Sequence, residues 1–159
     1  MLDRFGSIDV WVNNVGVGAV GYFWDIPIED HARLVDVNLK GLIYGAHAAL
    51  RVFRSQGGRG TLVNVGSVDS AVPIALQNTY AATKAAVRSL GHSLSEELRM
   101  AGDDDIKVGT IMPWAVDTPW WVRPGQHGCL RRHPRTDGRR GLPLTRFDGV
   151  GNCHRLGRR

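Results

Sequence analysis

Three short apolar runs alternate with two long amphipathic segments, and this alternation constrains the fold more than any other feature of the sequence. The runs are rich in β-branched residues and end in polar residues, glycine or proline, which is typical of buried strands. They lie at Ile8–Val12, Thr61–Ser67 and Ile106–Pro113. Apolar residues spaced three to four apart predict helices at Ile28–Ser55 and Thr79–Met100. The order strand, helix, strand, helix, strand predicts an α/β protein with a doubly wound parallel sheet.

Length and charge divide the chain into two parts. Its 159 residues are enough for one domain with a hydrophobic core. The periodic part, 1–122, carries a net charge of −3, whereas residues 123–159 contain ten arginines and carry +8. Arginine and glycine make up 17 of these last 37 residues, and no helical or strand repeat remains. We therefore expect 123–159 to be an irregular or disordered tail.

The composition disfavours several classes of protein. Cys129 and Cys153 both lie in the tail, and their spacing to His133 and His154 fits no zinc finger, so no metal site is predicted. No apolar stretch is long enough to span a bilayer, and the first residues lack a signal-peptide pattern, so we expect a cytoplasmic protein without a membrane partner. The tail arginines would bind nucleic acid electrostatically, but a disordered segment explains them more simply, and no nucleic-acid partner is predicted.

Polar side chains follow each predicted strand. Asn13 comes after the first strand, Ser67 ends the second, and the segment 113–118 follows the third. In open α/β sheets ligands bind beyond the carboxyl ends of the strands, so these residues are expected near one crevice. Tyr80 and Lys84 are four residues apart on a predicted helix and therefore lie on one face of it.

Ser67, Tyr80 and Lys84 together suit proton transfer to or from an oxygen atom. A phenol has a pKa of about 10, and a nearby ammonium group lowers it. Tyr80 would then exchange a proton with an alcohol or a carbonyl group while Ser67 holds the oxygen. Side chains do not carry hydride, so a nicotinamide cofactor would have to supply it. Taken alone, Tyr80 and Lys84 are more simply explained as a surface pair, and only the surrounding motifs favour chemistry.

Four motifs in the right order make the sequence similar to the short-chain dehydrogenase/reductase family. NNVG at 13–16 resembles the Asn-Asn-Ala-Gly motif after the family's fourth strand, and VNLKG at 37–41 resembles the segment with its helical active-site asparagine. VNVGS at 63–67, followed thirteen residues after its serine by YAATK, matches the family's catalytic serine and Tyr-x-x-x-Lys. The resemblance covers residues 5–118 and implies a partial Rossmann-type catalytic domain over 1–122.

The resemblance implies a role for each matching residue. Tyr80 would be the general acid/base, and Lys84 would lower its pKa and bind the nicotinamide ribose. Ser67 would position the substrate oxygen, and Asn38 would support a water that links Lys84 to solvent. The implied cofactor is NAD or NADP. Further cofactor contacts are implied for Asn13, Gly16, Pro113, Val116 and Thr118.

The sequence departs from the family in three places. The glycine-rich pyrophosphate loop and roughly 70 residues that precede the Asn-Asn-Ala-Gly strand in the family have no counterpart here. We therefore expect Ile8–Val12 to be an unpaired edge strand, and the glycines of 16–21 to form an ordinary loop. Trp114 stands where the family has the glycine of a Pro-Gly segment. The tail replaces the family's substrate-covering helices, and we hypothesise a frameshift near Val122, because GC-rich codons read out of frame encode arginine and glycine.

We therefore predict an oxidoreductase that transfers hydride between NAD(P) and a small-molecule alcohol or carbonyl substrate, and we expect the isolated chain to be inactive. The alternative is a non-catalytic fragment that acts as an interaction (dimerisation) module. The family's counterparts of the two predicted helices often build the subunit interface, so the resemblance also implies a homo-oligomer. A third alternative, nucleic-acid binding by the tail, predicts heparin retention that is lost when 123–159 are deleted.

Overall fold

A sheet of three parallel strands lies at the centre of the fold. The computed structural model describes residues 6–114, 116, 129–130, 145–147 and 153–155. The strands are β1 (Val10–Asn13), β3 (Gly60–Val65) and β4 (Ile106–Ile111), hydrogen-bonded in the order β1-β3-β4. Val63 of β3 lies opposite Val12 of β1 and Gly109 of β4. The predicted parallel sheet is confirmed, and all three strands end at the same edge.

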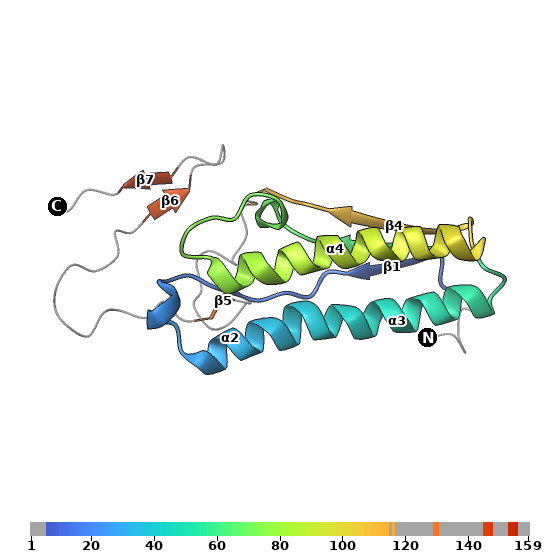
Figure 1. Cartoon of the computed structure of the whole chain (residues 1–159), viewed down its shortest axis with the longest axis horizontal. Coiled ribbons are helices and arrows are strands. Elements are labelled where there is room, and N and C mark those ends of the chain that lie inside the picture. The colour runs from blue at the N-terminus through green and yellow to red at the C-terminus, as the bar shows by residue number, and fades with distance from the viewer. Residues whose placement is uncertain (1–5, 115, 117–128, 131–144, 148–152, 156–159) are drawn as a thin grey trace.

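Two long helical segments connect the strands (Figure 1). The first consists of α2 (Ile28–Val35), the π-helical turn η2 (Asp36–Lys40) and α3 (Gly41–Ser55), which follow one another without a break. The second is α4 (Asn78–Ala101). Both helices predicted from the sequence are therefore confirmed to within one residue, but the π-helical turn inside the first was not predicted. Helical periodicity alone does not reveal it.

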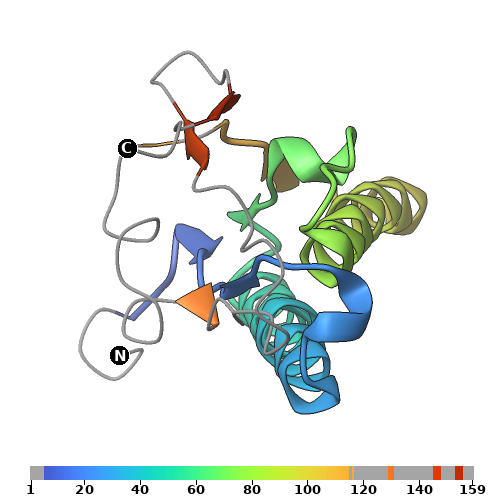
Figure 2. The ribbon, with the colours of Figure 1, turned by 90° about the vertical axis from the view of Figure 1, so that its left-hand side faces the viewer.

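Both helices cover the same face of the sheet (Figure 2). The core between them and the sheet contains Phe53 of α3, Leu62 of β3 and Leu98 of α4, with Trp11 of β1 packed against it. On the opposite face Val10 and Val12 are 55% and 53% exposed. Among the described residues β1 pairs only with β3, so it forms an edge of this sheet, as the sequence predicts.

The shorter elements lie between the main ones and in the tail. The 3-10 turns are η1 (Phe23–Asp25) and η3 (Val68–Ser70), and β2 (Gly18–Ala19) pairs in parallel with β5 (Cys129–Leu130). In the tail β6 (Thr145–Phe147) pairs antiparallel with β7 (Cys153–Arg155). Neither β2 in the expected loop nor any strand in the tail was predicted, because two or three residues are too few to produce a periodic pattern.

The described residues offer neither a membrane-spanning helix nor a cluster of metal ligands. None of their helices combines the length and apolarity needed to cross a membrane. They also contain no group of three or more His, Cys, Asp or Glu side chains placed to hold a metal ion.

Candidate active site

Asn38 lies in the middle of the π-helical turn and is only 1% exposed. Its Nδ2 donates to the carbonyl of Val17 at 2.9 Å and to Oγ1 of Thr83 at 3.1 Å, and its Oδ1 accepts from the Val17 N–H at 2.8 Å. The Thr83 hydroxyl in turn donates to the carbonyl of Tyr80 at 2.7 Å. A π turn widens the helix locally and is frequent at functional sites. Here it places an amide that joins the loop after β1 to α4.

Lys84 is buried beneath the end of β3. Its side chain is 5% exposed, and its Nζ donates to the carbonyl of Val65 at 2.8 Å. The same nitrogen lies 5.7 Å from the ring centroid of Tyr80, one helical turn earlier. Burial lowers the pKa of the Lys84 ammonium, because a charge loses hydration when it leaves water.

Gly16 brings the loop after β1 close to this lysine. A Cβ at Gly16 would lie 3.4 Å from Nζ of Lys84 and 3.5 Å from Oδ1 of Asn38. Gly16, Asn38 and Lys84 therefore lie together, and a Cβ at position 16 would be in van der Waals contact with both polar side chains.

Tyr80 packs against the apolar cluster of Ala19, Ile26 and Leu34, while its hydroxyl hydrogen-bonds to Ser67. Burial raises the pKa of Tyr80, the hydrogen bond with Ser67 lowers it, and the charge of Asp69 raises it, with a net shift upward. The predicted lowering of this pKa by Lys84 is therefore wrong here. The ammonium is hydrogen-bonded to Val65, whereas the phenol is desolvated and has a carboxylate near it.

Ser67 caps the turn η3, and Asp69 of that turn belongs to the same cluster. Ser67 Oγ accepts from the Asp69 N–H at 3.2 Å and donates to Asp69 Oδ2 at 3.3 Å. Asp69 Oδ1 accepts from the N–H of Ile74 at 3.2 Å. Burial raises the pKa of Asp69, and its bonds with Ser67 and Ile74 act in the other direction. Asp69 was not predicted as a site residue, although Ser-x-Asp directly after a strand is a pattern in which side chains cap a turn.

Asn13 makes its hydrogen bonds with residues outside this cluster. Asn13 Nδ2 donates to Oδ1 of Asn64 at 3.0 Å and to the carbonyl of Leu42 at 3.5 Å, and its Oδ1 accepts from the Trp11 ring N–H at 2.7 Å. Asn13 therefore links β1 to β3 and α3 by hydrogen bonds. Its contact with a cofactor stays a prediction.

The residues after β4 complete the predicted set. The carbonyl of Pro113 accepts from the N–H of Val68 at 3.1 Å, which ties the end of β4 to η3. Trp114 and Val116 are about half exposed. Thr118 lies outside the described residues.

The described residues suit one end of a nicotinamide dinucleotide. The Lys84 ammonium has three N–H donors, and Val65 takes one of them. The backbone of Gly16 packs close to Lys84 at the edge of the sheet where ligands bind. These features fit the hydroxyl groups of a ribose and the flat ring attached to it. The sequence contains no glycine-rich turn between a strand and a helix for the pyrophosphate.

Comparison with known proteins agrees with this geometry. A family model described as short chain dehydrogenase matches residues 1–126, which is most of the chain. This protein therefore belongs to the short-chain dehydrogenase/reductase family, as the four motifs predict.

Individual relatives are similar over most of this chain. The uncharacterized oxidoreductase YxnA of Bacillus subtilis (strain 168) is 35% identical over 136 residues, which are 84% of this chain and 36% of the relative. A 3-alpha-(or 20-beta)-hydroxysteroid dehydrogenase of Mycobacterium bovis is 36% identical over 120 residues, 74% of this chain and 45% of the relative. The crystal structure of acetoin dehydrogenase from Enterobacter cloacae superposes with a TM-score of 0.67 at 33% identity, covering 74% of this chain and 46% of that one. The chain thus spans about half or less of the length of these proteins.

Proposed function

We propose that this chain carries the proton-transfer and nicotinamide-ribose part of an NAD(P)-dependent alcohol/carbonyl oxidoreductase. The observation that carries the proposal is the buried Lys84 ammonium, held by Val65 between Gly16 and the ring of Tyr80. A buried ammonium is costly, so its position at the carboxyl end of a strand favours a binding role over a structural one. The similarity to a hydroxysteroid dehydrogenase and to an acetoin dehydrogenase supports a small alcohol or carbonyl compound as substrate.

Each residue of the cluster has a defined task in this proposal. The cofactor, when bound, supplies or accepts the hydride. Lys84 binds the ribose hydroxyls with the donors that Val65 does not take. Tyr80 holds the proton that is exchanged with the substrate oxygen, and Ser67 lies within hydrogen-bonding distance of the Tyr80 hydroxyl to orient it. Asn38 keeps the loop of Gly16 and Val17 against α4. Whether Asn38 also supports a water that serves Lys84 stays a prediction.

Nicotinamide mononucleotide tests the proposal, because it contains the ribose and the ring without the second nucleotide. Saturation transferred from the protein in an NMR experiment should reach the nicotinamide and ribose protons. Lys84→Met should abolish the transfer, whereas Lys107→Met, which changes an exposed lysine of β4, should leave it intact. No transfer to the wild-type chain at any soluble concentration would overturn the proposal.

Complete dinucleotides test whether these 159 residues suffice for activity. We expect calorimetric titration with NADH and NADPH to show binding weaker than millimolar, since no pyrophosphate loop is present in the sequence. Sub-millimolar binding would contradict this expectation. If turnover is found, Tyr80→Phe should abolish it, whereas a chain that serves only as an interaction module would keep its partner after the same substitution.

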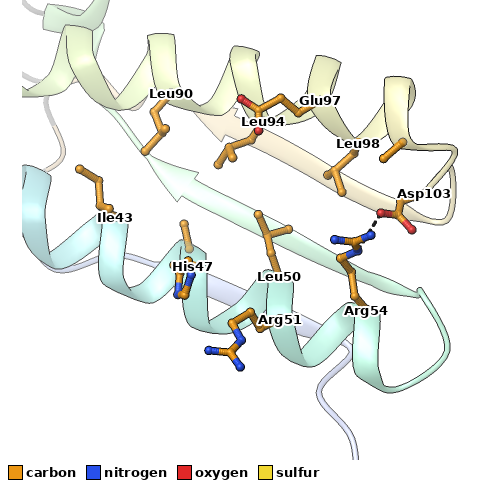
Figure 3. Close-up of a pocket in the computed structure, with 12 residues that line it drawn as sticks. Ile43, His47, Leu50, Arg51, Arg54, Leu90, Leu94, Glu97, Leu98 and Asp103 are labelled. Carbon is orange, nitrogen blue, oxygen red and sulfur yellow. Dashed lines mark ion pairs between the residues drawn. The ribbon is translucent and has the colours of Figure 1, made fainter.

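The groove between α3 and α4 supports a second candidate function, self-association (Figure 3). It has a volume of about 480 Å³, and Leu50, Leu90 and Leu94 contribute to its lining. Arg51 and other basic side chains line it from α3, and Glu97 lines it from α4. A two-fold dimer in which α3 of one copy packs against α4 of the other would bring basic and acidic side chains face to face twice. We propose a second copy of this chain as the occupant.

Sedimentation equilibrium tests this second candidate. Ile43→Glu places a charge at the groove, where Ile43 is 41% exposed, and should weaken self-association at least about tenfold. Ile28→Glu is the matched control, because Ile28 is an exposed isoleucine of α2 that does not line the groove. A wild-type chain that stays monomeric, or equal association constants for both variants, would contradict a dimer at this face.

A further inference from the structure

We propose that His31 is a positioning residue for Tyr80: it takes the place of an N-cap for α4 and, through Thr79, holds the first turn of that helix against α2 and η1. The functional meaning of this contact rests on the proposed function, in which Tyr80 exchanges the proton. The contact itself depends only on the surroundings of one buried imidazole ring.

The first turn of α4 begins without a capping side chain. The first N–H groups of a helix have no partner within it, and the side chain of the N-cap residue commonly supplies one. Within the described part of the chain, Gln77 at the N-cap forms no such bond. The N–H of Thr79 donates instead to Asn78 Oδ1 at 2.7 Å, and Asn78 Nδ2 donates to the carbonyl of Gly21 at 3.3 Å. The turn that carries Tyr80 therefore depends on contacts with other parts of the chain.

His31 of α2 supplies one of these contacts. The residue is 7% exposed, and its Nδ1 lies 2.6 Å from Oγ1 of Thr79. Its Nε2 lies 3.1 Å from the carbonyl oxygen of Phe23 in η1, and the rings of His31 and Phe23 pack with their centroids 4.7 Å apart. The imidazole ring of His31 therefore joins α2, η1 and the first turn of α4.

The Phe23 carbonyl determines which ring nitrogen of His31 carries the proton. A carbonyl oxygen only accepts, so Nε2 must be protonated to bond with it. In the neutral ring Nδ1 is then an acceptor, and the Thr79 hydroxyl donates to it. The ion pairs among the described residues include none with His31, and a buried charge without a partner is costly, so the neutral ring suits this position. The hydrogen bonds thus run from Thr79 to His31 and from His31 to Phe23.

The contact at Thr79 acts on Tyr80, because the two residues are adjacent in the chain. Tyr80 itself packs against an apolar cluster that includes Leu34, three residues after His31 in α2. α2 therefore holds the first turn of α4 twice, by a hydrogen bond at Thr79 and by apolar packing at Tyr80. Loss of the hydrogen bond should loosen this turn, while the remainder of α4 stays packed on the sheet.

Two variants of Thr79 in the full chain test the proposal by hydrogen exchange. Thr79→Val keeps the shape of the side chain and removes the hydroxyl, whereas Thr79→Ser, the matched control, keeps the hydroxyl. The Ala81 amide, which donates to the Gln77 carbonyl at 2.7 Å, should exchange about fivefold faster in Thr79→Val and at nearly the wild-type rate in Thr79→Ser. The Val87 amide in the middle of α4 should change in neither variant. Equal rates at Ala81 in the two variants, or an equal change at Val87, would overturn the proposal.

The environment of the Tyr80 ring separates a positioning role from a merely structural one. In a ¹³C-tyrosine-labelled chain, Tyr80→Phe identifies the Cζ signal of Tyr80 among the three tyrosines. This signal should shift in Thr79→Val and keep its wild-type position in Thr79→Ser, and the signal of Tyr44, which is 70% exposed, should not shift in either. An unchanged Tyr80 signal in a folded Thr79→Val chain would refute the positioning role.

The tautomer of His31 is a further test that needs only the wild-type fold. The chain has six histidines, and His31→Phe identifies the ring signals of His31 in a ¹⁵N-labelled sample. At about pH 8, Nε2 should give the signal of a protonated ring nitrogen and Nδ1 that of an unprotonated one. A proton on Nδ1 would overturn the proposal, whether or not Nε2 also carries one. None of these measurements depends on nicotinamide contact, so failure here and failure of the proposed function are distinguishable.

Discussion

The side-chain amide of Asn38 makes two hydrogen bonds to the backbone of Val17: Asn38 Oδ1 accepts from the Val17 N–H at 2.8 Å, and Asn38 Nδ2 donates to the Val17 carbonyl at 2.9 Å. An amide can pair with a peptide group in this way because it offers one donor and one acceptor side by side. Asn38 thereby pairs with the backbone of the loop after β1 as a neighbouring strand would. Gly16, which lies against Lys84, is the residue directly before Val17, so the side chain of Asn38 holds the loop of Gly16 in position.

Asn38→Ala should lower the free energy of unfolding by about 2–3 kcal/mol, since the polar groups of Val17 and Thr83 lose their partner at a partly buried position. Urea unfolding followed by circular dichroism measures the change. Lys40→Ala is the control. Lys40 lies two residues after Asn38 and forms an exposed ion pair with Asp36, so its loss should change the free energy of unfolding little. Equal stability of the two variants would show that water replaces Asn38 without cost.

Lys84→Met should change how stability depends on pH. Because burial lowers the pKa of Lys84 in the folded chain, the folded state binds fewer protons than the unfolded state below the ordinary value of 10.5. The contribution of Lys84 is therefore fully present above pH 10.5 and is lost as the pH falls through the folded-state pKa. Relative to Lys84→Met, the wild type should gain stability as the pH rises toward 10.5. If the free energy of unfolding depends on pH in the same way in both proteins from pH 7 to 10.5, the pKa of Lys84 is not lowered by burial.

Tyr80→Phe should reveal a pH dependence of stability of the opposite sign, at higher pH. The pKa of Tyr80 is raised above its ordinary value of 10.0, so the folded state retains a proton that the unfolded state loses. The stabilisation is fully present below pH 10 and is lost as the pH rises through the folded-state pKa. Relative to Tyr80→Phe, the wild type should therefore lose stability above pH 10, as measured by urea unfolding between pH 9 and 11.5. Tyr44→Phe, a change at an exposed tyrosine, supplies the control, and the proposed environment of Tyr80 is refuted if both variants behave alike.

The sequence predicted those parts of the site that depend on local spacing. Tyr80 and Lys84 share a helix face because helical geometry places residues four apart together, and Ser67 reaches Tyr80 because a short connection joins strand to helix. Charge and burial are set by the whole fold, and there the predictions were weaker. Asp69 was missed because carboxylates are usually exposed, and the direction of the Tyr80 pKa was wrong because desolvation cannot be seen in a motif.

Asn13 shows that a motif also does not specify the direction of a side chain. A strand-end asparagine is expected to border the crevice, and this stays a prediction. Side chains alternate between the faces of a strand, and that of Asn13 points to the helix-covered face. Its motif fixed the residue type without fixing the direction of the side chain. The family resemblance was still sufficient to identify the fold, because the order of four motifs reflects the order of the strands and helices.

Gly91→Ala should disturb the packing of α4 against the sheet. A Cβ at Gly91 would lie too close to the Thr110 hydroxyl of β4 and 3.3 Å from Nδ2 of Asn64, so the helix must move or the side chains must shift. We expect a loss of about 1–3 kcal/mol in the free energy of unfolding. Because α4 carries both Tyr80 and Lys84, transfer of saturation to nicotinamide mononucleotide should weaken as well. Gly109→Ala provides the control, since a Cβ there meets no atom within 4 Å.

Thr110→Ala tests the cause of that loss, because it removes the hydroxyl that the new Cβ would meet. The double variant Gly91→Ala with Thr110→Ala should be more stable than the sum of the two single changes predicts, since residues in contact are not additive. Additive losses would mean that the Thr110 hydroxyl is not the cause of the loss. Helix propensity alone would make the replacement of Gly91 by alanine favourable. A stabilised Gly91→Ala chain would therefore show that α4 does not approach β4 as closely as this packing requires.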